Sequence, residues 1–250
     1  MYTDTEGIIL KQTKTVNGRR MIILFSRKYG KISAGTSINE KGRSKAALAM
    51  RPFTYGRYEL FKNKQSYNIN GAEVIKSYYK LGQDVEKYMC CSYVLEFTEK
   101  LIIEDVPAPK IFDLVNDFFD IMERRNKKYL SLVLAYQIKS LQLFGSMPQI
   151  RECVLCGSKD ELIGFSVKDG GVICKKCMQN NKLNSNEKLI YNINFGIVDI
   201  LEYILGSSLK SFEKLGLDDE ILQCLSVIVK KYIEYHLDIG NLKSEGFLSD

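Results

Sequence analysis

Phe53–Phe61 (FTYGRYELF) is the stretch of sequence that decides the fold of the first third of this chain. Its residues alternate, so that Thr54, Gly56, Tyr58 and Leu60 fall on one face of an extended segment and their neighbours fall on the other. A period of two in a stretch rich in aromatic side chains is typical of a β-strand. The stretch therefore predicts a strand.

Four other short apolar runs accompany this strand within the first 80 residues, and turn signals separate them. They lie at 7–10, 21–25, 32–36 and 66–70. One of the connections is a polar, basic loop at 39–45 (NEKGRSK). About five short strands with glycines at their turns predict a small, closed or partly open β-barrel.

Beyond Leu81 the spacing of the apolar residues changes to the period of an α-helix. Helices are expected at 84–103, 110–124, 129–144, 195–205 and 218–237. Strands followed by helices predict an α+β fold. The expected domains are the β-barrel at 1–80, a helical domain at 81–148 that resumes at 183–250, and a cysteine-rich insertion at 149–182.

Four of the seven cysteines form two Cys-x-x-Cys pairs with 17 residues between them. Two such pairs at this distance are typical of a zinc site with four thiolate ligands. Gly157 suits the positive φ of a metal knuckle, and residues 162–174 predict a β-hairpin that joins the two pairs. Four thiolates leave no open coordination position, so we expect one structural Zn²⁺. Its ligands would be Cys153, Cys156, Cys174 and Cys177.

The charge of the chain is strongly asymmetric. Residues 1–80 contain 16 Lys and Arg against 5 Asp and Glu, a net charge of +11, whereas residues 81–250 contain 20 against 25, a net charge of −5. Positive charge concentrated in one small domain indicates a polyanionic partner such as DNA. The basic residues expected to contact DNA are Lys11, Arg27, Lys28, Lys31, Lys41, Arg43, Lys45, Arg51 and Arg57.

Aromatic side chains are the second ingredient of a single-strand binding surface, because bases stack on them. The candidates are Tyr29, Phe53, Tyr55 and Tyr58, although most aromatic residues of so small a barrel are expected to lie in its core. Phosphate contacts carry no sequence information, so we expect binding that is independent of base order.

Signatures of catalysis are missing from the sequence. It contains a single histidine, His236, and no phosphate-binding loop, dinucleotide fingerprint or HExxH motif. We therefore expect a protein that is not an enzyme. Two alternatives stay open: a nucleic-acid-modifying enzyme that carries a structural zinc ribbon, and a protein-interaction scaffold whose basic domain meets an acidic protein.

The beginning of the chain, Met1–Glu6, is polar and acidic, and no run of 18 apolar residues occurs. These features predict a cytoplasmic protein without a membrane span, and the expected binding to DNA would associate it with the nucleoid. In such a reducing compartment cysteines serve as metal ligands or core thiols rather than in disulfides.

Several segments resemble the RecO family of DNA repair and recombination-mediator proteins, in the same order along almost the whole chain. They are Glu6–Lys11 (EGIILK), Phe25–Ile32 (FSRKYGKI), Arg43–Lys45, Met50–Phe53 (MRPF), Pro148–Gly157 (PQIRECVLCG), Leu242–Ser244 and Phe247–Leu248. Residues 36–40 depart from the family's loop, since they are less basic and include Glu40.

This resemblance implies an N-terminal OB-fold, a helical C-terminal domain and an inserted zinc ribbon. It also implies binding of single- and double-stranded DNA and annealing of complementary strands after DNA damage. A RecR-type partner would help to load recombinase onto DNA coated by single-strand-binding protein, whose tail would dock on the helical domain. The DNA contacts implied by the resemblance are Lys31, Arg43, Lys45 and Arg51.

Overall fold

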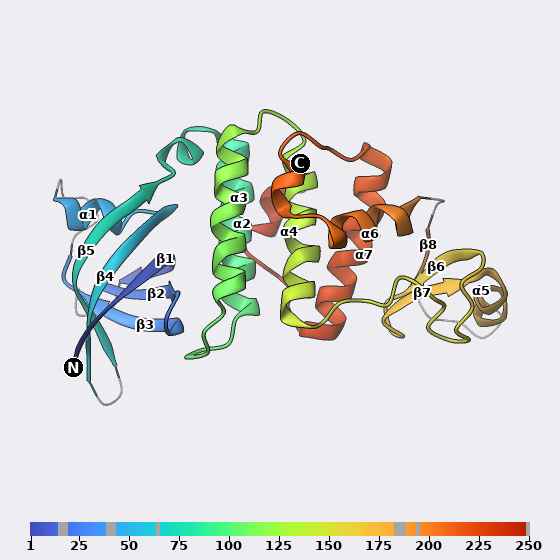
Figure 1. The fold of residues 1–250 in the computed structure, drawn as a ribbon, viewed down its shortest axis with the longest axis horizontal. Helices are drawn as coiled ribbons and strands as arrows, with labels where there is room; N and C mark the ends of the chain where they lie inside the picture. Colours follow the sequence, from blue (N-terminus) through green and yellow to red (C-terminus); the bar gives the residue numbers. More distant parts are fainter. Residues whose placement is uncertain (15–19, 39–43, 64–65, 183–188, 194–195, 249–250) are drawn as a thin grey trace. The chain divides into compact units, whose positions relative to one another are not determined.

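The computed structural model describes residues 1–14, 20–38, 44–63, 66–182, 189–193 and 196–248. They form an α+β protein, as predicted, with its large strands near the N-terminus and most of its helices after them (Figure 1). The chain divides into two compact units. The first unit consists of Met1–Arg125 and Leu242–Asp250, and the second consists of Asn126–Asn241.

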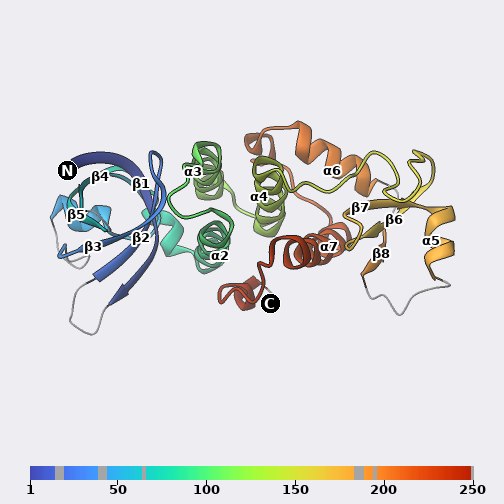
Figure 2. The same cartoon turned by 90° about the horizontal axis from the view of Figure 1, so that it is seen from below.

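The strands of the first unit form a closed barrel in the order β1-β2-β3-β5-β4 (Figure 2). Their bounds are β1 Tyr2–Lys14, β2 Arg20–Ser26, β3 Gly30–Thr36, β4 Thr54–Lys62 and β5 Tyr67–Ser77. Neighbouring strands are antiparallel except β3 and β5, which run parallel where Ala34–Thr36 meets Tyr67–Ile69. All five expected strands are present, and β1 and β5 are longer than their apolar runs suggested.

The alternation that predicted β4 reflects its two faces in the barrel. Thr54, Gly56, Tyr58 and Leu60 are buried, whereas residues between them such as Arg57 are exposed. The buried face belongs to a core that also contains Ile22, Leu24, Ile32 and Ile69. Burial of apolar area of this kind is the main force that stabilises so small a barrel.

A short helix, α1 (Lys45–Ala49), follows the basic loop and lies between β3 and β4 in the chain. Sequence analysis placed its first residue, Lys45, in a loop, and this was wrong. The Ser44 hydroxyl accepts a hydrogen bond from the Ala47 amide at 3.1 Å and caps the helix, and Ala47 and Ala49 are buried. The Tyr58 phenol, buried in the barrel, donates to the Ala49 carbonyl at 2.8 Å and links α1 to the core.

Two long helices complete the first unit against one side of the barrel, on the side away from α1 (Figures 1 and 2). They are α2 (Val85–Leu101), preceded by the 3₁₀ helix η1 (Tyr79–Gln83), and α3 (Pro109–Arg124). Asp84 caps the N-terminus of α2. Pro109 is the first residue of α3, where a backbone N–H has no partner within the helix, so the N–H that proline lacks is not missed. These helices match the predicted ranges to within two residues, but they belong to the same compact unit as the strands.

The end of the chain also belongs to the first unit. The Glu96 carboxylate of α2 accepts hydrogen bonds from the Lys243 amide at 3.0 Å, the Ser244 amide at 2.8 Å and the Ser244 hydroxyl at 2.6 Å. The 3₁₀ helix η3 (Glu245–Leu248) follows directly. A charged acceptor with three donors holds this segment firmly, which explains why the chain from Leu242 onward belongs to the first unit rather than the second.

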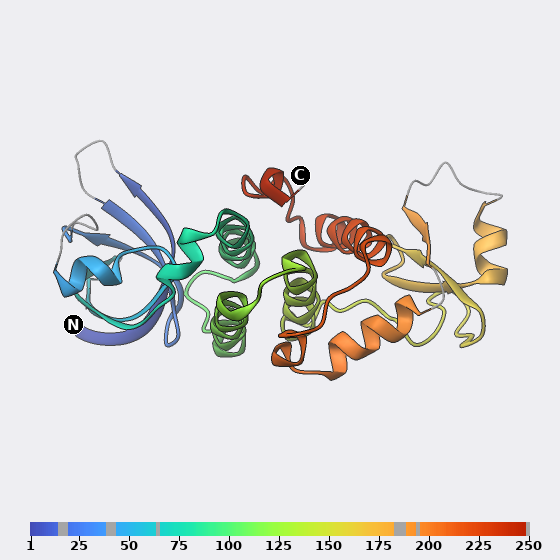
Figure 3. The same cartoon turned by 90° about the horizontal axis from the view of Figure 1, so that it is seen from above.

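In its described residues, the second unit combines four α-helices and a short 3₁₀ helix with a small sheet, as Figures 2 and 3 show for its ribbon. Its elements are α4 Tyr129–Phe144, β6 Leu162–Ser166, β7 Gly171–Cys174, α5 Lys175–Lys182, β8 Ile190–Asn192, α6 Ile197–Gly206, η2 Leu209–Phe212 and α7 Asp219–Leu237. The hairpin of β6 and β7 is the one predicted from residues 162–174, while α5 and β8 were not predicted. In the part of the chain described, no helix has the length and apolar character that a bilayer span requires.

Candidate nucleic-acid interface and metal centre

A groove at one end of the barrel is the candidate nucleic-acid interface, and we call it the barrel groove. The start of β2, the end of β3, the turn after β4 and the start of β5 line it, and its volume is about 1020 Å³. Its lining includes Lys14, Arg20, Phe61, Tyr67, Asn68 and Asn70. Cations, aromatic rings and amides together are suited to backbone phosphates and unpaired bases.

Two of these cations face each other across the sheet. In the register of β1 and β2, Lys14 is paired directly with Arg20. Like charges opposite each other destabilise an antiparallel pair. Both residues also line the barrel groove, so an anionic ligand bound there would lie close to two positive charges.

Lysine–tyrosine pairs extend the barrel groove along its rim. The Lys62 ammonium lies 5.0 Å from the ring centre of Tyr67, and the Lys28 ammonium lies 5.2 Å from that of Tyr29. The two tyrosine rings are 5.9 Å apart. A hydrogen bond with the Thr3 hydroxyl, aided by Lys28, holds the pKa of Tyr29 below its usual value despite partial burial. Tyr67 is 8% exposed and belongs to the barrel core, so these pairs offer the charges of both lysines and the stacking surface of Tyr29.

Three of the predicted DNA contacts also bind groups on the helices of the first unit. The Lys31 ammonium donates to the Glu99 carbonyl at 2.7 Å, and Lys11 lies 3.7 Å from the Glu99 carboxylate. Arg27 forms a two-pronged pair with Asp113 at 2.8 and 3.2 Å. The positive charge counted over residues 1–80 is therefore partly neutralised within the protein.

The other predicted contacts lie in different surroundings. Lys28 and Lys45 are exposed, and Arg51 is half-buried after α1. Arg57 is exposed on β4, but its cross-strand neighbours are the acids Glu6 and Glu73. Lys41 and Arg43 lie outside the described residues.

The aromatic expectation was wrong for two of its four residues. Phe53 and Tyr58 are buried, so neither can stack on a base. Tyr55 is half-buried, and its hydroxyl donates to the Glu6 carboxylate at 2.6 Å. Of the four candidates for stacking on a base, Tyr29 is therefore the one that lies at the groove rim. Sequence analysis missed Phe61, Lys62, Tyr67 and Asn68. The only available signal was the alternation of residues 66–70, which does not tell which face lines a groove.

The second site is a cluster of the four predicted cysteines in the second unit. The sulfur atoms of Cys153, Cys156, Cys174 and Cys177 all lie within 4.8 Å of one another. The Cys156 and Cys174 sulfurs are 3.7 Å apart. Four sulfurs at about 2.3 Å from a tetrahedral zinc ion would be separated by about 3.8 Å. The donor set and its spacing thus fit a thiolate-bound metal.

The local fold holds these sulfurs in place. Gly157 has a φ of +75° and its amide donates to the Cys153 carbonyl at 2.8 Å, closing the first knuckle. The Val154 amide donates to Val172 at 2.9 Å, which fixes that knuckle to β7. Cys174 ends β7, and Cys177 lies one turn into α5.

The pKa values of two cysteines in the cluster are shifted in opposite directions. Burial raises the pKa of Cys153, but backbone N–H groups of Cys174, Leu155 and Cys156 outweigh it and lower the pKa to about 7. Burial and the three neighbouring sulfurs raise the pKa of Cys177 to about 12. The first thiol is ready to ionise while the last cannot do so beside the others. A bound metal ion would remove this conflict.

Comparisons with known proteins agree along the whole chain. The family model described as "Recombination protein O N terminal" matches residues 1–78, and "Recombination protein O C terminal" matches residues 82–246. A protein of Alkaliphilus metalliredigens named "DNA repair protein RecO" is 27% identical over 98% of this chain and 97% of its own length. Proteins of the same name from Acetivibrio thermocellus and Caldanaerobacter subterraneus are each 26% identical, over 95% and 98% of this chain and 92% and 97% of their own lengths.

The fold and its two candidate sites define an α+β protein with an N-terminal β-barrel, a helical remainder and a four-cysteine cluster that fits zinc. Because both family models match, the chain belongs to the RecO family of DNA repair and recombination proteins.

Proposed function

We propose that this protein is a recombination mediator that binds single- and double-stranded DNA through the barrel groove and anneals complementary strands. The observation that carries the proposal is the meeting of cations and aromatic rings at one end of the barrel. The strand order, the parallel pairing of β3 with β5 and the position of α1 between β3 and β4 support assigning the barrel as an OB-fold. OB-folds bind oligonucleotides on the face of strands 2 and 3 and through the loops flanking this groove.

Annealing follows from charge neutralisation. Two DNA strands repel each other through their phosphates, and a basic groove lowers that repulsion by replacing condensed counterions. Lys14, Arg20, Lys28 and Lys62 would supply the nearest cations, and Lys45 and Arg51 would extend the surface on the side of α1. Lys41, Arg43 and Arg57 remain predicted contacts.

We propose that the cysteine cluster binds one structural Zn²⁺ in a zinc ribbon built from residues 149–182. Zinc would supply no reactive position, because Cys153, Cys156, Cys174 and Cys177 would complete its coordination. Its role would be to hold the hairpin of β6 and β7 and the start of α5 together.

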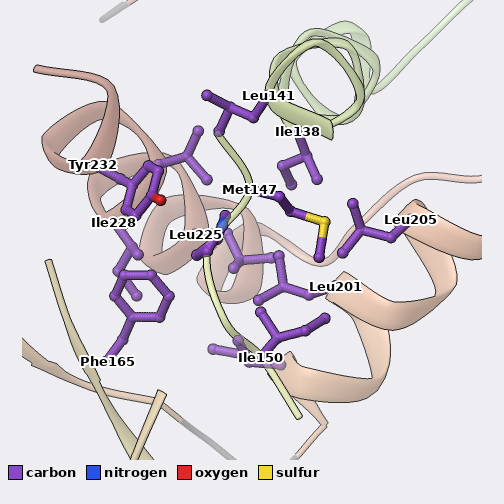
Figure 4. A pocket seen from close by; sticks show the side chains of 13 residues that line it. Ile138, Leu141, Met147, Ile150, Phe165, Leu201, Leu205, Leu225, Ile228 and Tyr232 are labelled. Carbon is purple, nitrogen blue, oxygen red and sulfur yellow. The ribbon is translucent and has the colours of Figure 1, made fainter. Parts of the chain in front are cut away.

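The proposed docking site for the tail of single-strand-binding protein is an apolar pocket between α4, α6 and α7 (Figure 4). Its lining includes Ile138, Leu201 and Tyr232, and its volume of about 20 Å³ leaves room for little more than a water molecule. Met147, 39% exposed at the pocket, is unbranched and could move to admit a larger group. The Lys139 ammonium donates to the Leu205 carbonyl at 2.7 Å and fixes α6 to α4.

We further propose that a RecR-type partner acts with this protein to load recombinase, at the nucleoid in the cytoplasm, and that no reaction is catalysed by the chain itself. The functional domains would be the barrel at 1–80, the helical domain at 81–148 and 183–250, and the ribbon at 149–182. The alternative function is a scaffold whose basic domain binds an acidic protein. No feature described above supports that function as specifically as the barrel groove supports DNA binding.

Salt-dependent binding of unstructured oligonucleotides tests the proposal. If about five phosphates are neutralised, a plot of log K against log salt should have a slope of about −3 to −4 for single strands. Affinity should be the same for strands of different base order. Fluorescence anisotropy with two labelled single strands of different sequence measures both quantities.

Annealing of one of these labelled strands to its complement gives the second readout. A flat salt response, or oligonucleotide binding that an acidic polypeptide matches in strength, would instead favour the scaffold. Backbone cleavage or base chemistry that depends on an acidic residue would favour the enzyme.

A further inference from the structure

A line of basic and aromatic side chains leads from the barrel groove toward α3, within the first unit. Tyr67 lines the groove, and its ring lies 5.9 Å from that of Tyr29. The Lys28 ammonium lies over Tyr29, and Arg27 precedes Lys28 in the chain. Arg27 and Lys28 are exposed and can bind phosphate, and the half-buried Tyr29 can stack on a base, so the line would extend a DNA path beyond the groove.

The last cation of this line, Arg27, forms an ion pair with the carboxylate of Asp113 on α3. Its two carboxylate oxygens lie 2.8 and 3.2 Å from the two terminal nitrogens of Arg27. The guanidinium also lies 5.5 Å from the ring centre of Phe112 and 3.8 Å from the Glu6 carboxylate. A two-pronged carboxylate uses the same donors that a phosphate would take. A DNA phosphate that bound both terminal nitrogens of Arg27 in the same two-pronged way would therefore have to displace Asp113.

We infer that Asp113 is a specificity-determining residue that ends the DNA path at Arg27 and limits the number of nucleotides that one chain occupies. This inference rests on the proposed DNA-binding function. Both side chains of the pair are partly exposed, at 42% and 54%, so a phosphate could approach Arg27 once the carboxylate charge is removed. Loss of that charge should lengthen the occupied segment by adding one phosphate contact.

The test compares Asp113→Asn with wild type on oligonucleotides of about 5 and about 16 nucleotides, which span the usual site sizes of an OB-fold. In about 0.1 M salt one added phosphate contact strengthens binding about fivefold. We expect that gain for the longer strand only, with no change for the shorter strand. Asp199→Asn, which removes the same charge from an exposed residue of α6, is the matched control and should change neither affinity.

Arg27→Ala gives a second measurement that does not depend on the behaviour of Asp113→Asn. In the wild-type background it should change affinity less than twofold, because Arg27 is already engaged, whereas in the Asp113→Asn background it should cancel the gain. Equal affinities of Asp113→Asn and Asp199→Asn for the longer strand, or a fivefold loss from Arg27→Ala alone, would overturn the inference. Failure of wild type to bind any oligonucleotide would instead overturn the proposed function.

Discussion

Replacing Cys153 or Cys177 by serine is expected to abolish metal binding and to open the hairpin of β6 and β7. The purified protein should contain about one zinc ion per chain, and either variant should contain close to none. Zinc bound to four protein ligands typically contributes on the order of 10 kcal/mol to the folding of a small module at neutral pH. The core around the cluster is small, comprising Ile173, Met178 and a few half-buried side chains, so it cannot replace that contribution.

Metal analysis, thermal unfolding and limited proteolysis together check this prediction. Cleavage in the variants should concentrate between residues 149 and 182, and a thermal transition should shift to lower temperature. Cys224→Ser is the matched control, because Cys224 lies in α7, outside the cluster, and should keep both the metal and the melting behaviour. A Cys177→Ser variant that retained a full equivalent of zinc would contradict a four-thiolate site.

Replacing Lys14 and Arg20 together by alanine is expected to weaken single-strand binding about 25-fold in about 0.1 M salt, since each lost phosphate contact weakens binding about fivefold. The slope of log K against log salt should become shallower by about 1.4. The double variant should fold normally, because Lys14 is the last residue of β1 and Arg20 is the first residue of β2, at the end of their pairing. Oligonucleotide titrations at three or more salt concentrations measure the affinity and the slope together.

Lys100→Ala with Lys110→Ala is the matched control for net charge. These exposed lysines lie on α2 and α3, outside the barrel groove, so their loss should change affinity by about twofold or less. If both double variants lost the same affinity, binding would depend on overall charge, and the barrel groove would not be the DNA site.

Local patterns in the sequence were enough to find most elements of both units. The alternation of Phe53–Phe61 predicted β4 and its two faces, and the helical spacing over 129–144 matched α4. The two Cys-x-x-Cys pairs named the four cysteines that the fold brings together. These features depend on residues close in the chain or on a fixed ligand spacing, so periodicity and spacing carry them.

Short or exposed elements were harder to predict. Helix α1 was missed because five residues are too few to show a helical period, and β8 because three residues cannot show an alternation. The return of Leu242 and the residues after it to the first unit depends on Glu96, almost 150 residues earlier in the chain. No local pattern connects the two.

By itself, the sequence determined that this chain has a basic β domain, a helical remainder and four clustered cysteines. Only the tertiary structure decided where the positive charges lie relative to acidic residues and to the groove. Lys11, Lys31 and Arg27 count as positive charges in the sequence, but α2 and α3 bring Glu99 and Asp113 against them. The pairing of strands, in turn, places Lys14 opposite Arg20 at the groove. Composition sums charges without regard to position, whereas their effect on a ligand depends on the distances that folding sets between residues far apart in the chain.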